Sequence, residues 1–379
     1  MSNFINPRVL AAESLDQLDY ELVAGTLMYR DRTEDFANVR GKKVGESVDI
    51  RTVTDFETDE FTGTINTQEI NQSATQLVIE KHFDVSVEIT ARERALNLDG
   101  IREEVINPAM VSMAQKIDTY LLTKVVEAQG LFASANLLEN AAEIAQARRA
   151  ANLQQISKTN RVGLVNDELE ATLLGTDVFH KFDTRGEPAV DALQEAMMDR
   201  LMGIDWFSTV NFPEVSYTPG DGTTTLDNTN ATDNVQGQST LVVAATAGTF
   251  NAGDKIKIAG AKRSFTVAAN TPATSTSIPI VEQINENLRG LDGAAITVQS
   301  SGTPVDYQGV IFNPGSFGFA APPLDEAAGD RTGVASAAGM SIRVTEWYDG
   351  ETKKTYWSFD MLVGAKCIDP RLALLLGKQ

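Results

Sequence analysis

Residues 76–90 alternate between apolar and polar side chains over an unusually long stretch, QLVIEKHFDVSVEIT. Such alternation is typical of a β-strand that buries one face. The expected buried face carries the odd-numbered residues Leu77, Ile79, Phe83, Val85, Val87 and Ile89, with Lys81 as the exception. Residues 46–53 alternate around Val48 and Ile50, which predicts a second strand.

The segment between these strands, residues 62–75, reads TGTINTQEINQSAT and holds only two large apolar residues. Two long strands joined by a polar segment predict an extended hairpin arm. Such an arm cannot bury both faces against its own small domain, so a neighbouring subunit is the expected place for it. The candidate intersubunit contacts in this arm are Thr62, Thr64, Asn66, Gln68, Asn71 and Gln72.

Helical spacing is clearest over residues 99–129, where apolar residues recur every three or four positions. Pro108 must kink this helix or restart it with Asn107 as its cap. Further helices are predicted from Asn6-Pro7, from Asn140 to about Asn152, from Asn166 to Gly175, and from Pro188 to Gly203. A short buried strand at 162–165 precedes the third of these, so the region predicts a mixed α/β domain.

The composition changes at about Glu214 and changes back at about Tyr307. Between them the chain is rich in Thr, Gly, Ala, Asn and Asp, and short alternating segments are separated by turns, which predicts a small antiparallel β barrel or sandwich. Its expected inward residues are Leu241, Val243, Ile256, Ile258, Phe265, Val267, Ile278 and Ile280. In its polar loop, residues 219–238, the candidate intersubunit contacts are Asp221, Asp227 and Asp233.

The acidic net charge and the scarcity of catalytic side chains argue against most enzymes and nucleic-acid-binding proteins. The chain has 379 residues, and its 52 acidic and 32 basic side chains give a net charge of −20 without a basic stripe. An acidic surface repels DNA, although a need for solubility alone would explain it equally well. With one cysteine, two histidines and no nucleotide-binding or hydrolase motif, we expect no catalytic residues, no metal and no cofactor.

Three stretches resemble local patterns of phage coat proteins: GIDWFSTVNFP at 203–213, FNAGDKIKIAG at 250–260 and MLVGAKCIDP at 361–370. Together with the order of predicted elements, they resemble the coat proteins of tailed double-stranded-DNA phages with the Hong Kong 97 fold. The similarity is greatest to the short-tailed-phage subfamily with an inserted β domain. It implies an α+β fold with a long spine helix, an extended β-hairpin E-loop, a mixed α/β axial domain and an inserted antiparallel β-barrel-like domain.

The resemblance divides the chain into the following expected segments. They are an N-terminal helical arm at 1–45, the extended hairpin at 46–91, the spine helix of the peripheral domain at 92–139, the axial domain at 140–213 and 307–340, the inserted β domain at 214–306, and a closing hairpin with the C-terminus in the peripheral domain at 341–379.

The same resemblance implies a structural subunit that forms an icosahedral capsid. Its expected partners are further copies of itself in hexamers and pentamers, a portal protein and a decoration protein, around double-stranded DNA that is enclosed without sequence-specific binding. A separate scaffolding protein is expected because no long charged coiled coil is present at the N-terminus. No apolar run is long enough for a membrane span, so assembly is expected in the host bacterial cytoplasm.

Two other classes remain open at this point. One is another phage tail or surface structural protein with a β module, although fibrous repeats and a secretion signal are not apparent. The other is a hydrolase with an unrecognised site. Electron microscopy would separate closed shells from rings, tubes or fibres.

Overall fold

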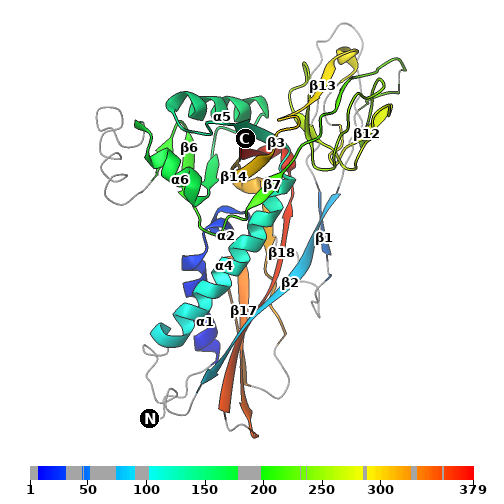
Figure 1. Ribbon diagram of the computed structural model, residues 1–379. Helices are drawn as coiled ribbons and strands as arrows, with labels where there is room; N and C mark the ends of the chain where they lie inside the picture. Colours follow the sequence, from blue (N-terminus) through cyan, green and yellow to red (C-terminus); the bar gives the residue numbers. More distant parts are fainter. Residues whose placement is uncertain are drawn as a thin grey trace, which may run out of the picture. The chain divides into compact units, whose positions relative to one another are not determined.

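The structure is a computed structural model that describes residues 7–30, 45, 47–51, 74–89, 102–177, 198–230, 232–235, 237–284, 288–325, 331–351 and 354–379. The chain forms two compact units, each assembled from segments far apart in sequence (Figure 1). The first unit comprises the described residues of Met1–Ile50, Thr75–Lys124 and Phe317–Ile368. The second comprises those of Arg51–Ala74, Val125–Ser316 and Asp369–Gln379.

The first unit is built on a six-stranded sheet with strand order β1-β2-β18-β17-β16, and β15 also pairs with β18. Its strands are β1 (Ser47–Arg51), β2 (Ala74–Ile89), β15 (Phe317–Ala320), β16 (Arg331–Ala337), β17 (Met340–Asp349) and β18 (Lys354–Cys367). Its helices are α1 (Pro7–Glu21), α2 (Ala24–Leu27), the π-helical turn η3 (Arg102–Ile106) and α4 (Asn107–Thr123), which continues into the 3-10 turn η4 (Lys124–Glu127).

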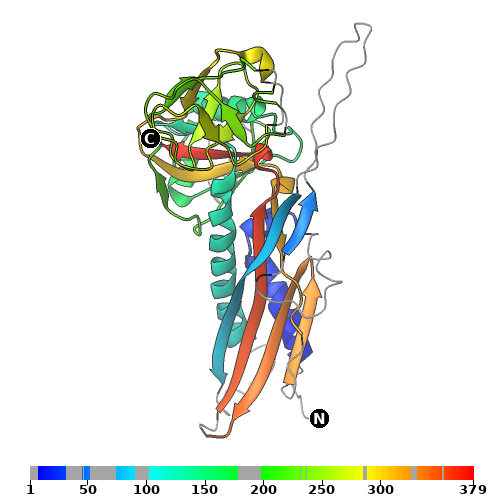
Figure 2. The same cartoon turned by 90° about the vertical axis from the view of Figure 1, so that its right-hand side faces the viewer.

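Helices α1 and α4 lie along one face of this sheet (Figure 2). Helix α1 packs on β16 and β17, and its buried residues include Leu10, Leu15 and Leu18. Helix α4 packs beside α1 and buries Met113 and Ile117, which are 1% and 0% exposed. The apolar stripe predicted for the long helix therefore faces the core.

The predicted helix over 99–129 is confirmed in the described residues, but it is not uniformly α-helical. Pro108 occupies the first turn of α4, where its missing N–H costs no hydrogen bond. The residues before it, Arg102–Ile106, form a wider π-helical turn that feeds into α4. The proline therefore changes the helix type at its start and leaves the helical path continuous.

A β-bulge in β2 makes part of the predicted buried face wrong. Lys81 pairs with Val363, but the next pair along the ladder is Ile79 with Gly364, so Glu80 is an extra residue on β2. One inserted residue reverses the face to which later side chains point. Leu77 and Ile79 accordingly pack with Ile50, Ala320, Leu362 and Ile368, a cluster on the sheet face opposite to Phe83.

Gly364 permits this bulge. A Cβ atom at Gly364 would lie 2.5 Å from the Val78 carbonyl oxygen, which is closer than real contacts allow. We expect Gly364→Ala to destabilise the chain by about 1–3 kcal/mol, because either the bulge or the β18 backbone must shift. Chemical denaturation measures the loss, and Gly350→Ala, at a position with open space around the new Cβ, is the control. Equal stability of the two variants would contradict the bulge geometry.

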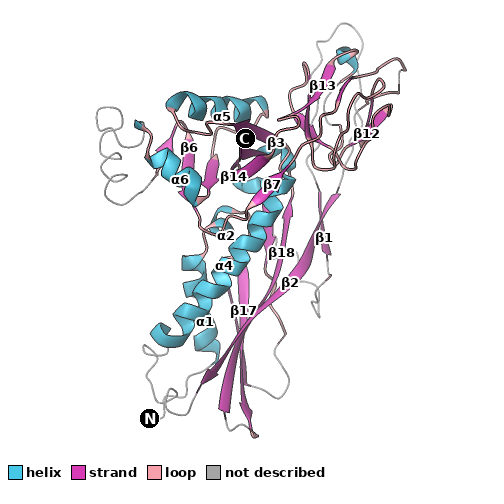
Figure 3. Cartoon of the chain, in the orientation of Figure 1, coloured by secondary structure: helices cyan, strands magenta, loops and turns pink. Residues whose placement is uncertain are grey.

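The second unit contains a seven-stranded mixed sheet and two helices (Figure 3). The strand order is β3-β19-β14-β4-β6-β5, with β7 also paired to β14. These strands are β3 (Gly130–Ser134), β4 (Val162–Val165), β5 (Arg200–Leu201), β6 (Ile204–Ser208), β7 (Val215–Tyr217), β14 (Val305–Phe312) and β19 (Ala373–Lys378), and the helices are α5 (Ala141–Leu153) and α6 (Asp167–Leu174). The short turns η6 (Pro314–Ser316) and η7 (Pro370–Leu372) flank the passages into and out of the first unit.

Both predicted helix caps in this unit are confirmed. The Asn140 side chain accepts hydrogen bonds from the N–H groups of Ala142 and Glu143, at 3.0 Å each. The Asn166 side chain accepts one from the Leu169 N–H at 2.9 Å. These bonds satisfy amide groups that have no partner inside their own helices.

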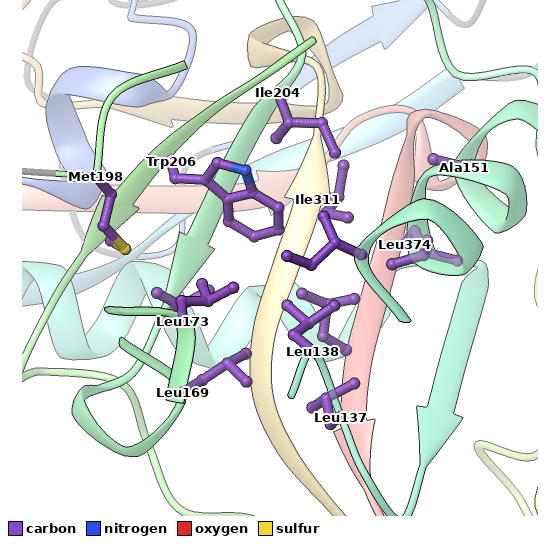
Figure 4. Packing of buried hydrophobic residues seen from close by; sticks show 14 of the residues in the cluster. Leu137, Leu138, Ala151, Leu169, Leu173, Met198, Ile204, Trp206, Ile311 and Leu374 are labelled. Carbon is purple, nitrogen blue, oxygen red and sulfur yellow. The ribbon is translucent and has the colours of Figure 1, made fainter. Parts of the chain in front are cut away.

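Apolar residues from α5, α6 and the sheet meet in one core (Figure 4). Trp206 on β6 lies beside Ile204, with Leu169 and Leu173 of α6 nearby, and Ile311 stands centrally on β14. The core thus joins residues between Leu137 and Trp206 with residues much later in the chain, Ile311, Leu374 and Leu376.

The predicted helix from Pro188 to Gly203 is wrong at its end, and its residues up to 197 lie outside the described ones. Arg200–Leu201 is strand β5, which pairs antiparallel with β6. Met202 and Gly203 connect the two strands with φ values of 51° and 77°. Positive φ at both central residues is the geometry of a tight hairpin turn, which a helix cannot contain.

Residues 223–298 form a further group of strands in the second unit, which we call the β module. Its strands are β8 (Thr223–Thr225), β9 (Thr240–Val242), β10 (Lys255–Ile258), β11 (Ser264–Thr266), β12 (Ser277–Pro279) and β13 (Ala295–Val298), and η5 (Arg289–Leu291) precedes the last. One sheet has the order β11-β10-β13-β8, and β12 pairs with β9. The bridges Leu226–Val243 and Val267–Ile280 join the two sheets at both edges, so the strands follow one another in a ring.

Both units include residues from the last third of the chain. Residues 317–340 belong to the first unit, where β15 and β16 pair with β18 and β17. Residues 369–379 belong to the second unit, where β19 pairs with β3 and β14. The division of the chain into axial, peripheral and inserted domains stays a prediction.

Candidate functional site

The three aspartates predicted as intersubunit contacts each accept a backbone hydrogen bond within the chain. The bonds of Asp227 and Asp233 lie within the polar loop 219–238, and Asp221 binds Thr249 outside it. Asp221 Oδ1 accepts a hydrogen bond from the Thr249 N–H at 3.0 Å. Asp227 Oδ1 accepts from the Thr229 N–H at 3.0 Å, and Asp233 Oδ2 accepts from the Asn230 N–H at 3.0 Å. In the single chain these carboxylates fix the shape of the loop.

These bonds also favour the ionised carboxylates. The Thr249 backbone N–H lowers the pKa of Asp221, and the Thr229 hydroxyl lowers the pKa of Asp227. Both aspartates therefore carry full negative charge at neutral pH and present an acidic loop.

Asn234 organises the same loop, and sequence reasoning missed it. Its buried side-chain amide donates to the carbonyls of Asp227 and Val242, at 2.9 Å each, and its Oδ1 accepts from the Val242 N–H at 2.8 Å. Its φ of 49° is a conformation that asparagine tolerates better than most residues. In the sequence Asn234 is one asparagine in a polar segment. That pattern does not indicate whether its side chain is buried and hydrogen-bonded or exposed to solvent.

The other predicted contact residues, Thr62, Thr64, Asn66, Gln68, Asn71 and Gln72, lie outside the described residues. The hairpin strands that lead to them are partly described, as β1 and β2. The assignment of this arm to intersubunit contacts therefore stays a prediction.

The face of the six-stranded sheet opposite α1 carries a set of paired charges. Asp360 on β18 accepts hydrogen bonds from Arg343 through Nε, at 3.0 Å, and through a second guanidinium nitrogen. His82 Nε2 on β2 lies 3.2 Å from Asp360 Oδ2. The His82 side chain is 42% exposed.

Aromatic and charged pairs continue this face towards the β17–β18 turn. Trp347 and Tyr356 stack with their ring centroids 5.5 Å apart, and Lys354 Nζ lies 2.7 Å from Glu88 Oε1. Neighbouring cross-strand pairs of this kind stabilise a long sheet. This face of the sheet therefore presents paired charged side chains and stacked aromatic rings.

At the bulge, Glu80 connects β2 to the end of α4. Its carboxylate accepts hydrogen bonds from the Tyr120 hydroxyl and from Lys124 Nζ, at 3.0 Å each. Partial burial opposes ionisation, but the hydrogen bonds from Lys124 and Tyr120 prevail and hold the pKa of Glu80 below its usual value. The extra residue of the bulge is thus anchored to the long helix.

A buried carboxylate on α4 holds the N-terminal segment. Asp118 accepts hydrogen bonds from the N–H groups of Val23, at 2.9 Å, and Gly25, at 3.1 Å. Burial raises the pKa of Asp118, while the backbone N–H groups of residues 23–25 act in the opposite direction. The contact fixes the start of α2 against α4.

The described side chains do not form a cluster suited to a metal ion. Among them, no group of three or more His, Cys, Asp and Glu residues is placed to hold a metal ion. Cys367 is buried in β18, and His180 lies outside the described residues. No helix in the described part of the chain is long and apolar enough to cross a membrane.

Comparisons with known proteins give matches in structure and none in sequence. No protein-family model matches the chain, and no curated protein matches it. A structure from Mycobacterium phage Che8 is similar with a TM-score of 0.51 and 11% identity, over 94% of this chain and 90% of that one. The capsids of Ralstonia phage GP4 and of cyanophage P-SCSP1u match with TM-scores of 0.46 and 0.45, identities of 8% and 11%, and coverage of 89% of this chain and 84% of each of theirs.

Similarity to the Che8 phage structure over nearly the whole of both chains decides the fold class. The chain has an α+β fold similar to that of this phage structure.

Proposed function

We propose that this chain is the major capsid subunit of a tailed double-stranded-DNA phage and assembles with further copies into an icosahedral shell. The observation that carries the proposal is the likeness to the Mycobacterium phage Che8 structure over 94% of the chain. The sequence resemblance to coat proteins with the Hong Kong 97 fold supports it independently.

In this proposal the elements take the roles that the resemblance implies. The arm that continues β1 and β2 is the E-loop, α4 with its flanking turns is the spine helix, and the second unit supplies the axial domain. The β module is the inserted domain, and its ring of strands around the buried side chains of Leu241, Ile256 and Phe265 supports that role.

Assembly would rest on many weak contacts. A pairwise contact of about −4 kcal/mol corresponds to a millimolar dissociation constant, which keeps free subunits soluble and lets misplaced ones leave. Closure of the shell multiplies such contacts and makes the product durable. A scaffolding protein, a portal protein and a decoration protein are the proposed partners, with assembly in the host bacterial cytoplasm and the virion capsid as the final location.

Electron microscopy of the purified chain, produced with a scaffolding protein from the same phage, tests the proposal. Closed shells tens of nanometres across are the expected result. Rings, tubes or fibres would instead support a tail or surface structural protein. Production without the scaffolding protein is the control that shows whether closure depends on it.

The free subunit should not bind DNA appreciably at physiological ionic strength. Its net charge of −20 repels phosphates, and counterion release needs clustered lysines and arginines. We expect no gel shift of duplex DNA at about 150 mM salt. A dissociation constant tighter than about micromolar under these conditions would contradict a wall that encloses DNA without binding it.

The β module should fold by itself. Its core residues form a cluster of their own, including Phe250, Ile258 and Ile296, and a segment of this size can fold without disulfides or metal. We expect a fragment of residues 212–308 to be soluble, rich in β-structure and cooperative in unfolding. A dispersed two-dimensional NMR spectrum supports this, and a random-coil spectrum would show that the strands depend on the rest of the second unit.

A further inference from the structure

One serine of the β module is the meeting point of hydrogen bonds from the seven-stranded sheet and its helices. Gln154, at the end of α5, donates through Nε2 to Ser264 Oγ at 2.7 Å and accepts from the Ser264 N–H at 3.4 Å. Gln129, beside β3, donates to the Ser264 carbonyl. Gln299, the residue directly after β13, donates to the same hydroxyl at 3.1 Å.

A lysine reinforces this junction from the neighbouring strand. Lys255 on β10 is 3% exposed, and its Nζ donates to the Thr266 hydroxyl at 3.0 Å and to the Val126 carbonyl at 3.4 Å. The contacts across the junction are therefore polar, made by amide, hydroxyl, ammonium and backbone groups.

Apolar packing stays separate on the two sides. The core around Trp206 and Ile311 and the core around Phe265 and Ile256 share no residue among those described. Opening an apolar interface exposes apolar surface to water, which costs free energy. Polar groups that separate form hydrogen bonds with water instead, so opening a polar interface costs less. Interfaces between parts of a chain that are polar in this way usually permit relative motion.

Two buried amide oxygens at the junction, Gln129 Oε1 and Gln299 Oε1, have no hydrogen-bond partner in the described structure. An unsatisfied buried acceptor raises the free energy of the closed arrangement, and contact with water relieves it. The two unsatisfied oxygens therefore offset part of what the hydrogen bonds of the closed junction contribute.

A second attachment of the module lies next to Lys255 along the chain, at Asp254 and the strands that enter and leave the module. Strands β7 and β14, which enter and leave the module, pair antiparallel at Val215–Tyr217 and Val305–Tyr307. The buried Asp254 accepts hydrogen bonds from the Tyr217 hydroxyl at 2.7 Å and from the Gly220 N–H at 3.0 Å. These bonds tie the first residues of the module to its core next to the paired strands.

We propose that the β module turns about the β7–β14 pair and that the polar junction centred on Ser264 is a latch that opens and closes. The motion is a property of the free subunit. Its use, to adapt one chain to unlike positions in a shell, rests on the proposed function.

Distance measurements between spin labels on the two sides of the latch test the proposal. Labels on Val210→Cys, outside the module, and Val281→Cys, inside it, occupy side chains that are 73% and 62% exposed, while the native Cys367 is buried. The parent should give one narrow distance distribution. Ser264→Ala removes the hydroxyl shared by two glutamines, so we expect the open population to rise about tenfold and a second distance to appear.

Gln154→Ala removes the partner from outside the module and should produce the same second distance. Because Gln154 lies outside the module, the Gln154→Ala change does not act by unfolding the module. This variant therefore tests the latch even if Ser264→Ala disturbs the fold. Ser239→Ala, the same change at an exposed position of the module, should match the parent. Unchanged distributions in both latch variants, or a parent as broad as they are, would overturn the latch. Because the free subunit is measured, this outcome is independent of whether shells form.

Discussion

Ile117→Asp is expected to destabilise the chain by more than about 3 kcal/mol, because it places an unpaired carboxylate in a core. Ile117 is 0% exposed and lies on the face of α4 that packs in the first unit. The carboxylate that α4 does bury, Asp118, is satisfied by the backbone N–H groups of Val23 and Gly25, whereas Ile117 lies in the apolar stripe of the helix. Thermal or chemical denaturation measures the change.

Gln115→Asp is the matched control for this prediction. Gln115 lies on the exposed side of α4, two residues before Ile117, so the same charge there remains in water. Its effect should stay within about 0.5 kcal/mol. If both variants unfold at the same denaturant concentration as the parent, the assignment of the buried helix face is wrong.

Replacing residues 62–75 by a short Gly/Ser turn is expected to abolish stable shells while leaving a folded subunit. The segment is polar, so its removal takes little from any core, whereas contacts that it makes with neighbours would be lost at every position of a shell. Circular dichroism and thermal unfolding check the fold, and electron microscopy of the assembly reaction counts the shells.

The turn at residues 300–303 provides the comparison for the arm. It joins β13 to β14 and is largely exposed, so a Gly/Ser replacement there makes a similar change in a place without a predicted contact role. That variant should still form shells. Normal shells from the variant that lacks residues 62–75 would refute the arm as an intersubunit contact.

Local features of this fold could be predicted because their causes lie within a few residues. Asn140 and Asn166 cap helices because a short side-chain oxygen reaches the next amide groups, wherever the helix lies. The predicted inward residues of the β module, from Leu241 to Ile280, are all buried, because alternation in a strand fixes which side chains share a face.

Other features depended on partners far along the chain. The bulge at Glu80 is apparent only from the register between β2 and β18, and it sends Leu77 and Ile79 to the face opposite the one that their parity predicts. Likewise, β5 forms where a helix was expected because β6 offers an antiparallel partner across a tight turn. Local propensity favours neither outcome strongly, so pairing decides.

The features of the candidate site also fall into two groups, those that follow from the sequence and those that depend on the tertiary structure. The sequence by itself determined which residues are polar, acidic and exposed, and that catalytic side chains are scarce, because composition and periodicity need no partner. The tertiary structure decided that Asp227 and Asp233 bind backbone of their own loop and that Asp221 binds Thr249 outside it. It also decided that Asn234 organises the loop and that Gln129 and Gln154 converge on Ser264. Such convergence brings together residues more than one hundred positions apart, and hydrogen bonds of about 3 Å exist only once the strands have set those positions.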